Sequence, residues 1–206
     1  MLSIKWYGHS CFVIKYNDFS IVTDPFDSCV NYKLPIINPD IITVSHYHGD
    51  HSEPEFLKKA PVIDQNNLIY NSNNINITGI KSYHDENMGK ERGENTIFHF
   101  KIQNNISIIH LGDLGCKMPK ISDIAENLII LAPFGGFFTI DGNKSLEIAQ
   151  KLKAKYLIPM HYKTDKVDFE LKKLSDYNFE FIKKDIIEIN NINDFPTNLE
   201  IIELSY

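Results

Sequence analysis

The stretch "SHYHGDHSEPE", residues 45–55, places three histidines and an aspartate within six positions. It follows the apolar run "IITVS", residues 41–45, which is typical of a buried strand. A single His-x-His pair is often no more than two surface histidines, but four candidate ligands directly after a buried strand are not explained in that way. The sequence therefore predicts a metal site at the exit of this strand.

The spacing within the stretch favours two adjacent metal positions over one. Residues two apart in an extended segment point to the same side, so His46 and His48 can reach one ion together. Gly49 permits a tight turn, after which Asp50 and His51 point elsewhere. Imidazole and carboxylate ligands without thiolate suit zinc, iron or manganese better than a structural Cys-rich zinc site.

Composition limits the class of protein to which this stretch belongs. The chain has 206 residues, 43% of them hydrophobic, and we expect one domain over residues 1–206. The net charge of -6 and the lack of a basic stripe argue against a nucleic-acid partner. Cys11, Cys29 and Cys116 are too scattered for a disulfide framework and fit a reducing compartment.

The amino-terminal stretch "MLSIKWYGHSCFVIKY" alternates polar and apolar residues, which is not the pattern of a secretory signal. No window approaches the ~20 consecutive apolar residues that cross a bilayer. We therefore expect a soluble, cytoplasmic protein that does not bind membranes.

Periodicity predicts an α/β architecture with mixed sheets. The predicted strands cover residues 2–7, 11–16, 20–23, 41–45, 75–80, 96–103, 106–111, 128–132, 156–160 and 199–204. The predicted helices cover residues 144–153 and 166–175, with shorter ones at 53–59 and 121–126. Ser52 and Glu55 fit a capping box at the start of the helix predicted at 53–59.

Three further candidate ligands follow predicted strands elsewhere in the chain. His84 ends "ITGIKSYH", Asp113 follows "ISIIHLG", and His161 ends "YLIPMH". Each one alone is more often a loop or core residue than a ligand. Together they share one topological position, the crevice edge of an open α/β sheet, which raises all three as candidates.

The string His-x-His-x-Asp-His at 46–51, with a later His, a Gly-Asp and a final His in that order, resembles the metallo-β-lactamase superfamily. The stretches "WYGHSCFVI" (6–14), "TDPF" (23–26), "APFGGFFTID" (132–141) and "IPMHYKT" (158–164) are similar to one branch of it. That branch contains ascorbate-6-phosphate lactonase-like and other zinc-dependent hydrolases, and the match spans residues 4–164.

The resemblance implies an αββα four-layer sandwich with a two-metal site between the sheet edges. It assigns His46, His48 and His84 to the first metal. It assigns Asp50, His51 and His161 to the second, with Asp113 bridging the two. The cofactors would be two divalent ions, with zinc favoured and manganese or iron as alternatives. A His at position 48, where diiron oxidoreductases of the superfamily have Glu, favours hydrolysis over redox chemistry.

The function that follows is hydrolysis by a metal-bridging hydroxide. The bond would be an ester, lactone, phosphodiester or amide of a small molecule, with an anionic substrate as one option, and Asp50 would carry protons. A nuclease of the same superfamily and a noncatalytic metal-binding protein on this scaffold are the alternatives. Self-association into a homo-oligomer is compatible with the resemblance, whereas β-lactam hydrolysis does not follow from the superfamily name.

Other residues of these motifs have two interpretations each. Asp24, in "TDPF", either braces the histidine loop by hydrogen bonding or only forms a turn. His9, in "YGHS", is a candidate catalytic proton donor or substrate contact, or else a structural histidine in a turn. His99 and His110 lie inside predicted strands and are interpreted as structural.

Two loops are candidates for the rim of the site. Lys90 and Arg92, in "NMGKERGEN", either recruit an anionic substrate or are ordinary solvated charges. In "PFGGFFTIDG" the aromatic side chains form apolar walls or belong to the core, and Asp141 is interpreted as a helix cap. The three aromatic residues of this loop are Phe134, Phe137 and Phe138.

Overall fold

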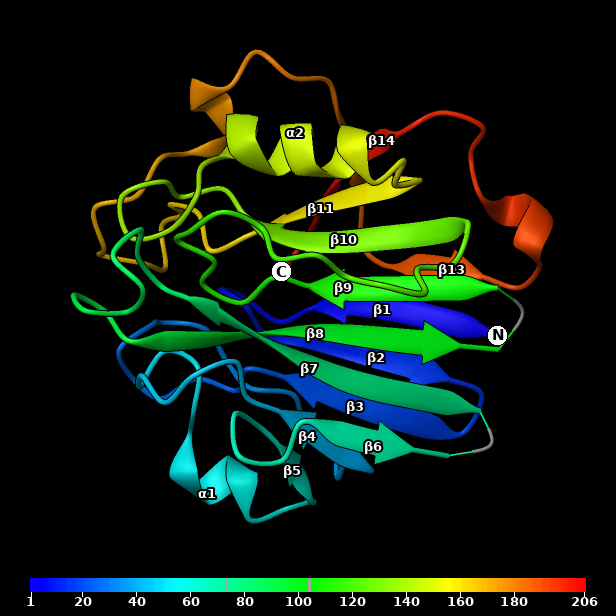
Figure 1. Cartoon of the computed structure of the whole chain (residues 1–206), viewed down its shortest axis with the longest axis horizontal. Coiled ribbons are helices and arrows are strands. Elements are labelled where there is room, and N and C mark those ends of the chain that lie inside the picture. Colours follow the sequence, from blue (N-terminus) through cyan, green and yellow to red (C-terminus); the bar gives the residue numbers. More distant parts are fainter. Residues whose placement is uncertain (73, 104) are drawn as a thin grey trace.

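The computed structural model describes residues 1–72, 74–103 and 105–206, and within these residues the chain forms two mixed β-sheets (Figure 1). The six-stranded sheet contains, in spatial order, β13 (Ile187–Ile189), β1 (Leu2–Trp6), β2 (Phe12–Tyr16), β3 (Phe19–Thr23), β4 (Ile41–Thr43) and β5 (Val62–Ile63). The eight-stranded sheet contains β12 (Phe181–Lys184), β14 (Glu200–Leu204), β11 (Tyr156–Met160), β10 (Asn127–Pro133), β9 (Ile106–His110), β8 (Glu94–Ile102), β7 (Ile75–Tyr83) and β6 (Ile69–Asn71).

Strand direction follows the sequence pattern. In the larger sheet each neighbouring pair in the series β12, β14, β11, β10, β9 is parallel. Each neighbouring pair in the series β9, β8, β7, β6 is antiparallel. Every residue of β9 and β10 is buried, which explains why these strands read as continuous apolar runs rather than alternating ones. In the smaller sheet β13 to β3 are antiparallel, and β3, β4 and β5 are parallel.

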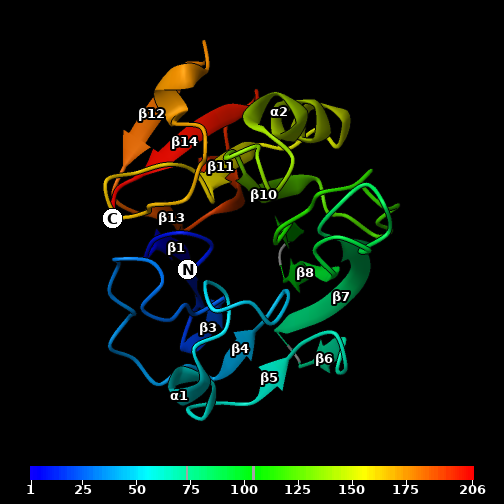
Figure 2. The ribbon, with the colours of Figure 1, turned by 90° about the vertical axis from the view of Figure 1, so that its left-hand side faces the viewer.

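The two sheets pack against each other, and each carries a helix on its outer side (Figure 2). One apolar cluster joins Ile14 and Ile21 of the smaller sheet to Phe98 and Ile108 of the larger one. Helix α1 (Pro54–Leu57) lies beside the smaller sheet, and α2 (Gly142–Lys151) packs on β10 and β11. The predicted αββα sandwich is confirmed, with short outer layers.

Two of the predicted helices are wrong. Residues 166–175 form turns and the short 3₁₀ helix Leu174–Asp176, because their backbone pairs with distant segments: Lys172 N donates to Gly135 O at 2.9 Å and Lys166 O accepts from Asn31 N. Residues 121–126 are irregular, with Asp123 at a φ of 60° and Ala125 N bonded to Ser107 Oγ. Tertiary contacts therefore override helical spacing in both places.

The helix predicted at 53–59 exists as α1, but its cap differs from the prediction. Glu53 is the N-cap, and its side chain accepts a hydrogen bond from Glu55 N. Ser52 Oγ instead donates to His48 O at 2.8 Å, so Ser52 closes the ligand loop and does not cap the helix. The strands β5, β6, β12 and β13 were not predicted, since each has only two to four residues.

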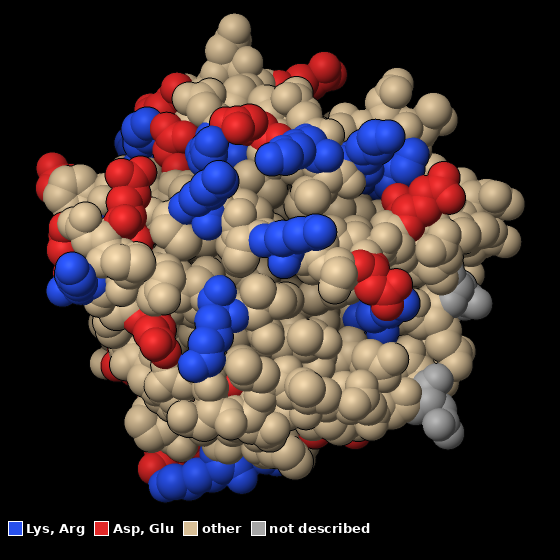
Figure 3. Space-filling model, in the orientation of Figure 1, with Lys and Arg blue, Asp and Glu red and all other residues tan. Residues whose placement is uncertain are grey.

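The loops that carry the candidate ligands leave strands of both sheets at one edge of the sandwich. Asp24 follows β3, His46 to His51 follow β4, His84 follows β7, Asp113 follows β9, and His161 follows β11. Among the described residues no helix is long and apolar enough to cross a membrane. On the face drawn in Figure 3, Lys and Arg side chains lie among acidic and uncharged ones.

Candidate metal centre

Three histidines from two loops form the first cluster of inward-facing ligand atoms. His46 and His48 leave β4 and His84 leaves β7, and one ring nitrogen of each lies within 4.8 Å of the others. We call His46, His48 and His84 the three-histidine group. His46 and His84 are buried, whereas His48 is exposed, so this group opens towards solvent at His48.

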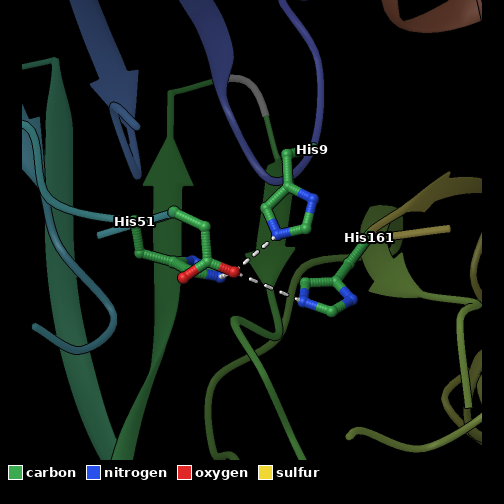
Figure 4. Close-up of side chains that lie close together, drawn as sticks. His9, His51 and His161 are labelled. Atoms are coloured by element: carbon green, nitrogen blue, oxygen red, sulfur yellow. Dashed lines mark hydrogen bonds and ion pairs between the residues drawn. The ribbon is translucent and has the colours of Figure 1, made fainter. Parts of the chain in front are cut away.

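A second cluster combines one carboxylate with three imidazoles, and we call His9, Asp50, His51 and His161 the aspartate group. Their ligand atoms also lie within 4.8 Å of one another. Asp50 Oδ2 is 3.0 Å from His9 Nε2, 3.6 Å from His51 Nε2 and 4.0 Å from His161 Nε2. Figure 4 shows the rings of His9, His51 and His161 arriving from separate segments around this carboxylate.

Asp113 joins the two groups. Its Oδ2 is 3.1 Å from His84 Nε2 of the three-histidine group and 3.1 Å from His161 Nε2 of the aspartate group. Its Oδ1 is 3.3 Å from His51 Nε2. The structure therefore brings all seven predicted ligands together, and it places Asp113 between the two groups.

Buried Asp24 orients a histidine in each group. Asp24 Oδ2 accepts a hydrogen bond from His51 Nδ1 at 2.8 Å and another from Ser45 Oγ at 2.7 Å. Because the Ser45 hydroxyl donates to Asp24, it accepts from His46 Nδ1, which lies 3.0 Å away. Both imidazoles thus carry their proton on Nδ1 and turn Nε2 towards the centre. Of the two interpretations of Asp24, the structure shows the bracing one, and Asp24 braces the loop from a turn, at a φ of 38°.

The atoms that face inward fit a divalent ion. His84 Nδ1 is 3.1 Å from Phe138 O, which leaves its Nε2 free to face the site. Seven buried side-chain atoms have no hydrogen-bond partner in the described part of the chain, and three of them are ligand atoms that face the centre: His46 Nε2, His51 Nε2 and Asp113 Oδ1. Buried polar atoms are rarely left unpaired unless they have a catalytic role or hold an ion. Imidazole nitrogens with carboxylate oxygens are also a donor set that zinc prefers.

The pKa values of the histidines reflect burial and the three carboxylates. Burial, and then the charge of neighbouring His51, holds the pKa of His46 well below its usual value. Burial, and then His161, lowers the pKa of His9 to about 4. For His51 burial opposes the charge, yet Asp113 and Asp50 raise its pKa well above the usual value. The pKa of His84 is also raised, by Asp113 against burial. Without metal, His51 and His84 therefore hold a proton more tightly than usual, and a metal ion would replace it.

The carboxylates stay ionised for the complementary reason. Burial alone would raise the pKa of Asp113, but His161 and His51 hold it well below its usual range. The pKa of Asp50 is lowered in the same way, by His51 and His9 against burial. Both carboxylates thus enter the site as anions, which is the form that binds a metal.

Local backbone features aim the ligands. His51 N donates to His48 O at 3.0 Å and closes the turn around Gly49, where a Cβ would lie only 2.4 Å from Asp27 Oδ2. Gly112 has a φ of 54°, which turns the chain so that Asp113 N meets Asn95 Oδ1 at 2.9 Å. The Gly-Asp pair thus has a conformational reason as well as a chemical one.

His9 ties the two sheets together at the site. Its backbone oxygen accepts from Trp6 Nε1 at 2.9 Å and from His161 N at 3.1 Å. The ring centres of His9 and His161 lie 4.1 Å apart, and His9 Nε2 contacts Asp50 Oδ2. The sequence pattern offered a catalytic and a structural interpretation, and the geometry places His9 behind Asp50, outside the lining of the cavity described next.

A cavity of about 360 Å³ opens beside the ligand groups. Ligand side chains form one wall, and an Arg, a Glu and two phenyl rings form the rest. The lining residues are His48, Asp50, His84, Glu91, Arg92, Asp113, Phe138, His161 and Phe169. This size and mixed lining suit a small organic molecule.

Each of the two predicted rim loops contributes one of its candidate residues to the cavity lining. Arg92 lines the cavity, whereas exposed Lys90 does not. Phe138 lines it, Phe134 is fully buried in the core, and Phe137 is 59% exposed. Asp141 caps α2, accepting from Lys144 N at 3.1 Å, as predicted.

The two remaining buried histidines have structural partners, in agreement with the sequence interpretation. His99 Nε2 is 2.8 Å from Ser107 Oγ. His110 Nε2 is 3.0 Å from Ser10 O, and its Nδ1 accepts from Gly112 N. Neither belongs to the two ligand groups.

Several residues that shape the site are not marked by any pattern in the sequence. Ser45 sets the proton position on His46, Asn95 positions Asp113, and Phe169 lines the cavity. Ser45 sits between a strand and the ligand loop, which is a weak signal. Phe169 was hidden inside the wrongly predicted helix.

Comparison with known proteins agrees with this geometry. The family model described as "Beta-lactamase superfamily domain" matches residues 3–161. A protein named UPF0173 metal-dependent hydrolase from Lawsonia intracellularis is 27% identical over 79% of this chain and 84% of its own. Another with that name, from Methanocaldococcus jannaschii, is 29% identical over 88% of this chain and 91% of its own.

A solved structure shows the same fold over nearly the whole chain. It is a Thermotoga maritima protein assigned to the zinc-dependent hydrolases of the metallo-β-lactamase superfamily. The two are 30% identical with a TM-score of 0.74, covering 99% of this chain and 98% of the other. The chain therefore belongs to the metallo-β-lactamase superfamily and is an enzyme of its metal-dependent hydrolase class.

Proposed function

We propose that this protein is a hydrolase with a two-metal centre that cleaves an ester, lactone, phosphodiester or amide bond of a small anionic molecule. The three-histidine group would hold one divalent ion, Asp50, His51 and His161 of the aspartate group would hold the other, and Asp113 would contact both. The observation that carries this proposal is the position of Asp113, whose Oδ2 lies 3.1 Å from a histidine of each group. Zinc is the metal that suits these ligands best, and manganese and iron are compatible with them.

The metals would supply Lewis acidity, which lowers the pKa of water and polarises the bond to be cleaved. The chain supplies orientation. Asp24 and Ser45 fix the rings of His51 and His46, so the site needs little reorganisation before reaction. Phe138 and Phe169 cover one side of the cavity and keep water from that side of the substrate.

Asp50 and His9 form a pair suited to handling a proton. The pKa of His9 is about 4, so its ring is neutral near neutral pH, and Nε2–H donates to Asp50 Oδ2 at 3.0 Å. Asp50 lines the cavity, where its carboxylate would accept a proton released during hydrolysis. His9 would hold that carboxylate in place from behind.

A small-molecule substrate is favoured over a nucleic acid. The chain has a net charge of -6, with 27 Asp and Glu against 21 Lys and Arg. Tight binding of nucleic acid requires several phosphate contacts from clustered Lys and Arg.

The test is metal analysis of the purified protein followed by a substrate screen. The expected result is close to two ions per chain and hydrolysis of at least one among esters, lactones, phosphodiesters and amides. Removing the metal with a chelator should abolish that activity, and adding zinc back should restore it. Unchanged hydrolysis by the metal-free protein, or a single ion per chain at full activity, would contradict the two-metal proposal.

A further inference from the structure

The cavity has a second polar element besides its ligand wall. It is the connection between β7 and β8, residues 84–93, which lies at the left of Figure 1. This connection contributes Glu91 and Arg92 to the lining, next to the ring of Phe138. The hydrolytic role proposed above uses neither of these two charges.

Asp85 holds this connection in one conformation. Its Oδ1 accepts from Asn87 N at 2.8 Å and Gly89 N at 3.0 Å, and its Oδ2 accepts from Glu91 N at 3.1 Å and Arg92 N at 2.9 Å. Desolvation would raise the pKa of Asp85, but these four donors lower it below its usual value. The backbone that carries Glu91 and Arg92 is thus fixed from inside the loop, which preorganises their side chains.

Arg92 has an aromatic neighbour and an incomplete ion pair. Its guanidinium carbon lies 5.7 Å from the centre of the Phe138 ring, within the range of a cation–π contact. Its Nη1 is 3.7 Å from Glu91 Oε2, which is too long for a hydrogen bond. The side chains of Arg92 and Glu91 are 34% and 53% exposed, so this pair is weak and easily exchanged.

Glu91 is itself a carboxylate inside the cavity. Its other oxygen, Oε1, accepts a hydrogen bond from Asn87 Nδ2, so the Glu91 carboxylate keeps a hydrogen-bond partner when it separates from Arg92. The chain's own carboxylate next to Arg92 indicates the kind of group that this guanidinium accepts, since its planar fork matches a carboxylate.

We propose that Arg92 binds the carboxylate of a substrate whose apolar body lies against Phe138 and Phe169, and that Glu91 competes for Arg92 until the substrate displaces it. This inference rests on the proposed function, because it concerns the substrate of the same site. The substrate class is an apolar or aromatic carboxylic acid derivative whose second, cleavable group faces the ligand wall. Lys90, which is exposed and outside the cavity lining, has no part in it.

The test measures binding of 3-phenylpropionate to the zinc-loaded protein by calorimetry, with the neutral 3-phenylpropionamide for comparison. Arg92→Gln should lower the affinity for 3-phenylpropionate about tenfold or more, since a hydrogen bond to a charged group is lost. Glu91→Gln should raise that affinity about two- to fivefold, because a weak competing ion pair is removed. Lys90→Gln, on the same loop, is the matched control and should leave the affinity for both compounds unchanged.

Opposite effects of neighbouring substitutions separate this role from a structural one, since loop damage would weaken binding in both variants. Equal affinity of wild type and Arg92→Gln for 3-phenylpropionate would overturn the proposal, as would weaker binding in Glu91→Gln. Metal content and the substrate screen are measured on the same samples. If the pattern of affinities appears in a protein that hydrolyses nothing, the proposed function fails and the anion site stands. If hydrolysis is found but affinity ignores Arg92, only the anion site fails.

Discussion

The three-histidine group and the aspartate group lie side by side but are built differently. The first has imidazoles only, one of them exposed, and a carboxylate reaches it through Asp113. The second has Asp50 as its own carboxylate, and its three histidines are all buried. A divalent ion in the second group would therefore meet more negative charge and less water. Two neighbouring metal positions thus need not bind their ions equally tightly.

Asp113→Ala should have the largest effect, because Asp113 contacts histidines of both groups. The variant leaves the inward-facing nitrogens without a shared carboxylate, so we expect loss of both ions and a fall in kcat/KM on the order of 10³-fold. Metal analysis and rates on the best screened substrate measure this. Retention of both ions would show that the two groups bind metal independently of Asp113.

His48→Ala compared with His161→Ala tests the difference between the groups directly. Each variant removes one ligand from one group, so each should keep about one ion and lose most activity. The ion that remains in His48→Ala, held by the aspartate group, should resist a competing chelator better than the ion that remains in His161→Ala. The reverse order of resistance would mean that burial and the extra carboxylate do not decide affinity.

Asp24→Asn should lower the metal affinity of both groups, because Asp24 orients His51 directly and His46 through Ser45. Loss of such an orienting partner typically costs about 10- to 100-fold in metal affinity. Asp40→Asn is a close control. Asp24 accepts from Ser45 N on Oδ1 and from Ser45 Oγ on Oδ2, and the exposed Asp40 likewise accepts from Ser20 N and Oγ, at 2.8 and 2.9 Å, both on Oδ2. Competition with a chromogenic chelator gives both affinities, and a loss confined to one ion would break the link through Ser45.

The sequence predicts the parts of this site that are local. The spacing within residues 46–51 predicts four ligands. The position of His84, Asp113 and His161 after strands predicts the other three. The orientation of the rings is not visible there, because Ser45 and Asp24 meet only when β3 and β4 pair. The cavity wall at Phe169 escapes for a similar reason: its segment has helical spacing but takes its backbone partners from distant residues.

The same distinction holds for charged side chains. Lys90 and Arg92 are equivalent in sequence, two basic residues in one polar loop. Four hydrogen bonds to Asp85 set the path of the backbone, and Arg92 faces the cavity while Lys90 is exposed. No periodicity argument covers such a loop, because its conformation is decided by one buried carboxylate.

The smallest expected effect is the pH dependence of stability in the metal-free protein. The pKa of His9 is lowered to about 4 by burial, against about 6.5 in an unfolded chain, so between these values only the unfolded chain binds the proton and stability rises with pH. The pKa of His51 is raised by Asp113 and Asp50, so above about pH 6.5 only the folded chain keeps the proton and stability falls.

These opposite slopes predict maximum stability of the metal-free protein at about pH 6.5, with changes on the order of 1 kcal/mol per pH unit on either side. Zinc replaces the proton on His51, so the loaded protein should instead keep gaining stability above that pH. Urea unfolding at a series of pH values, with and without zinc, measures both curves. A metal-free protein whose stability still rises at pH 8 would mean that neither His51 nor His84, whose pKa Asp113 also raises, keeps an extra proton in the folded chain.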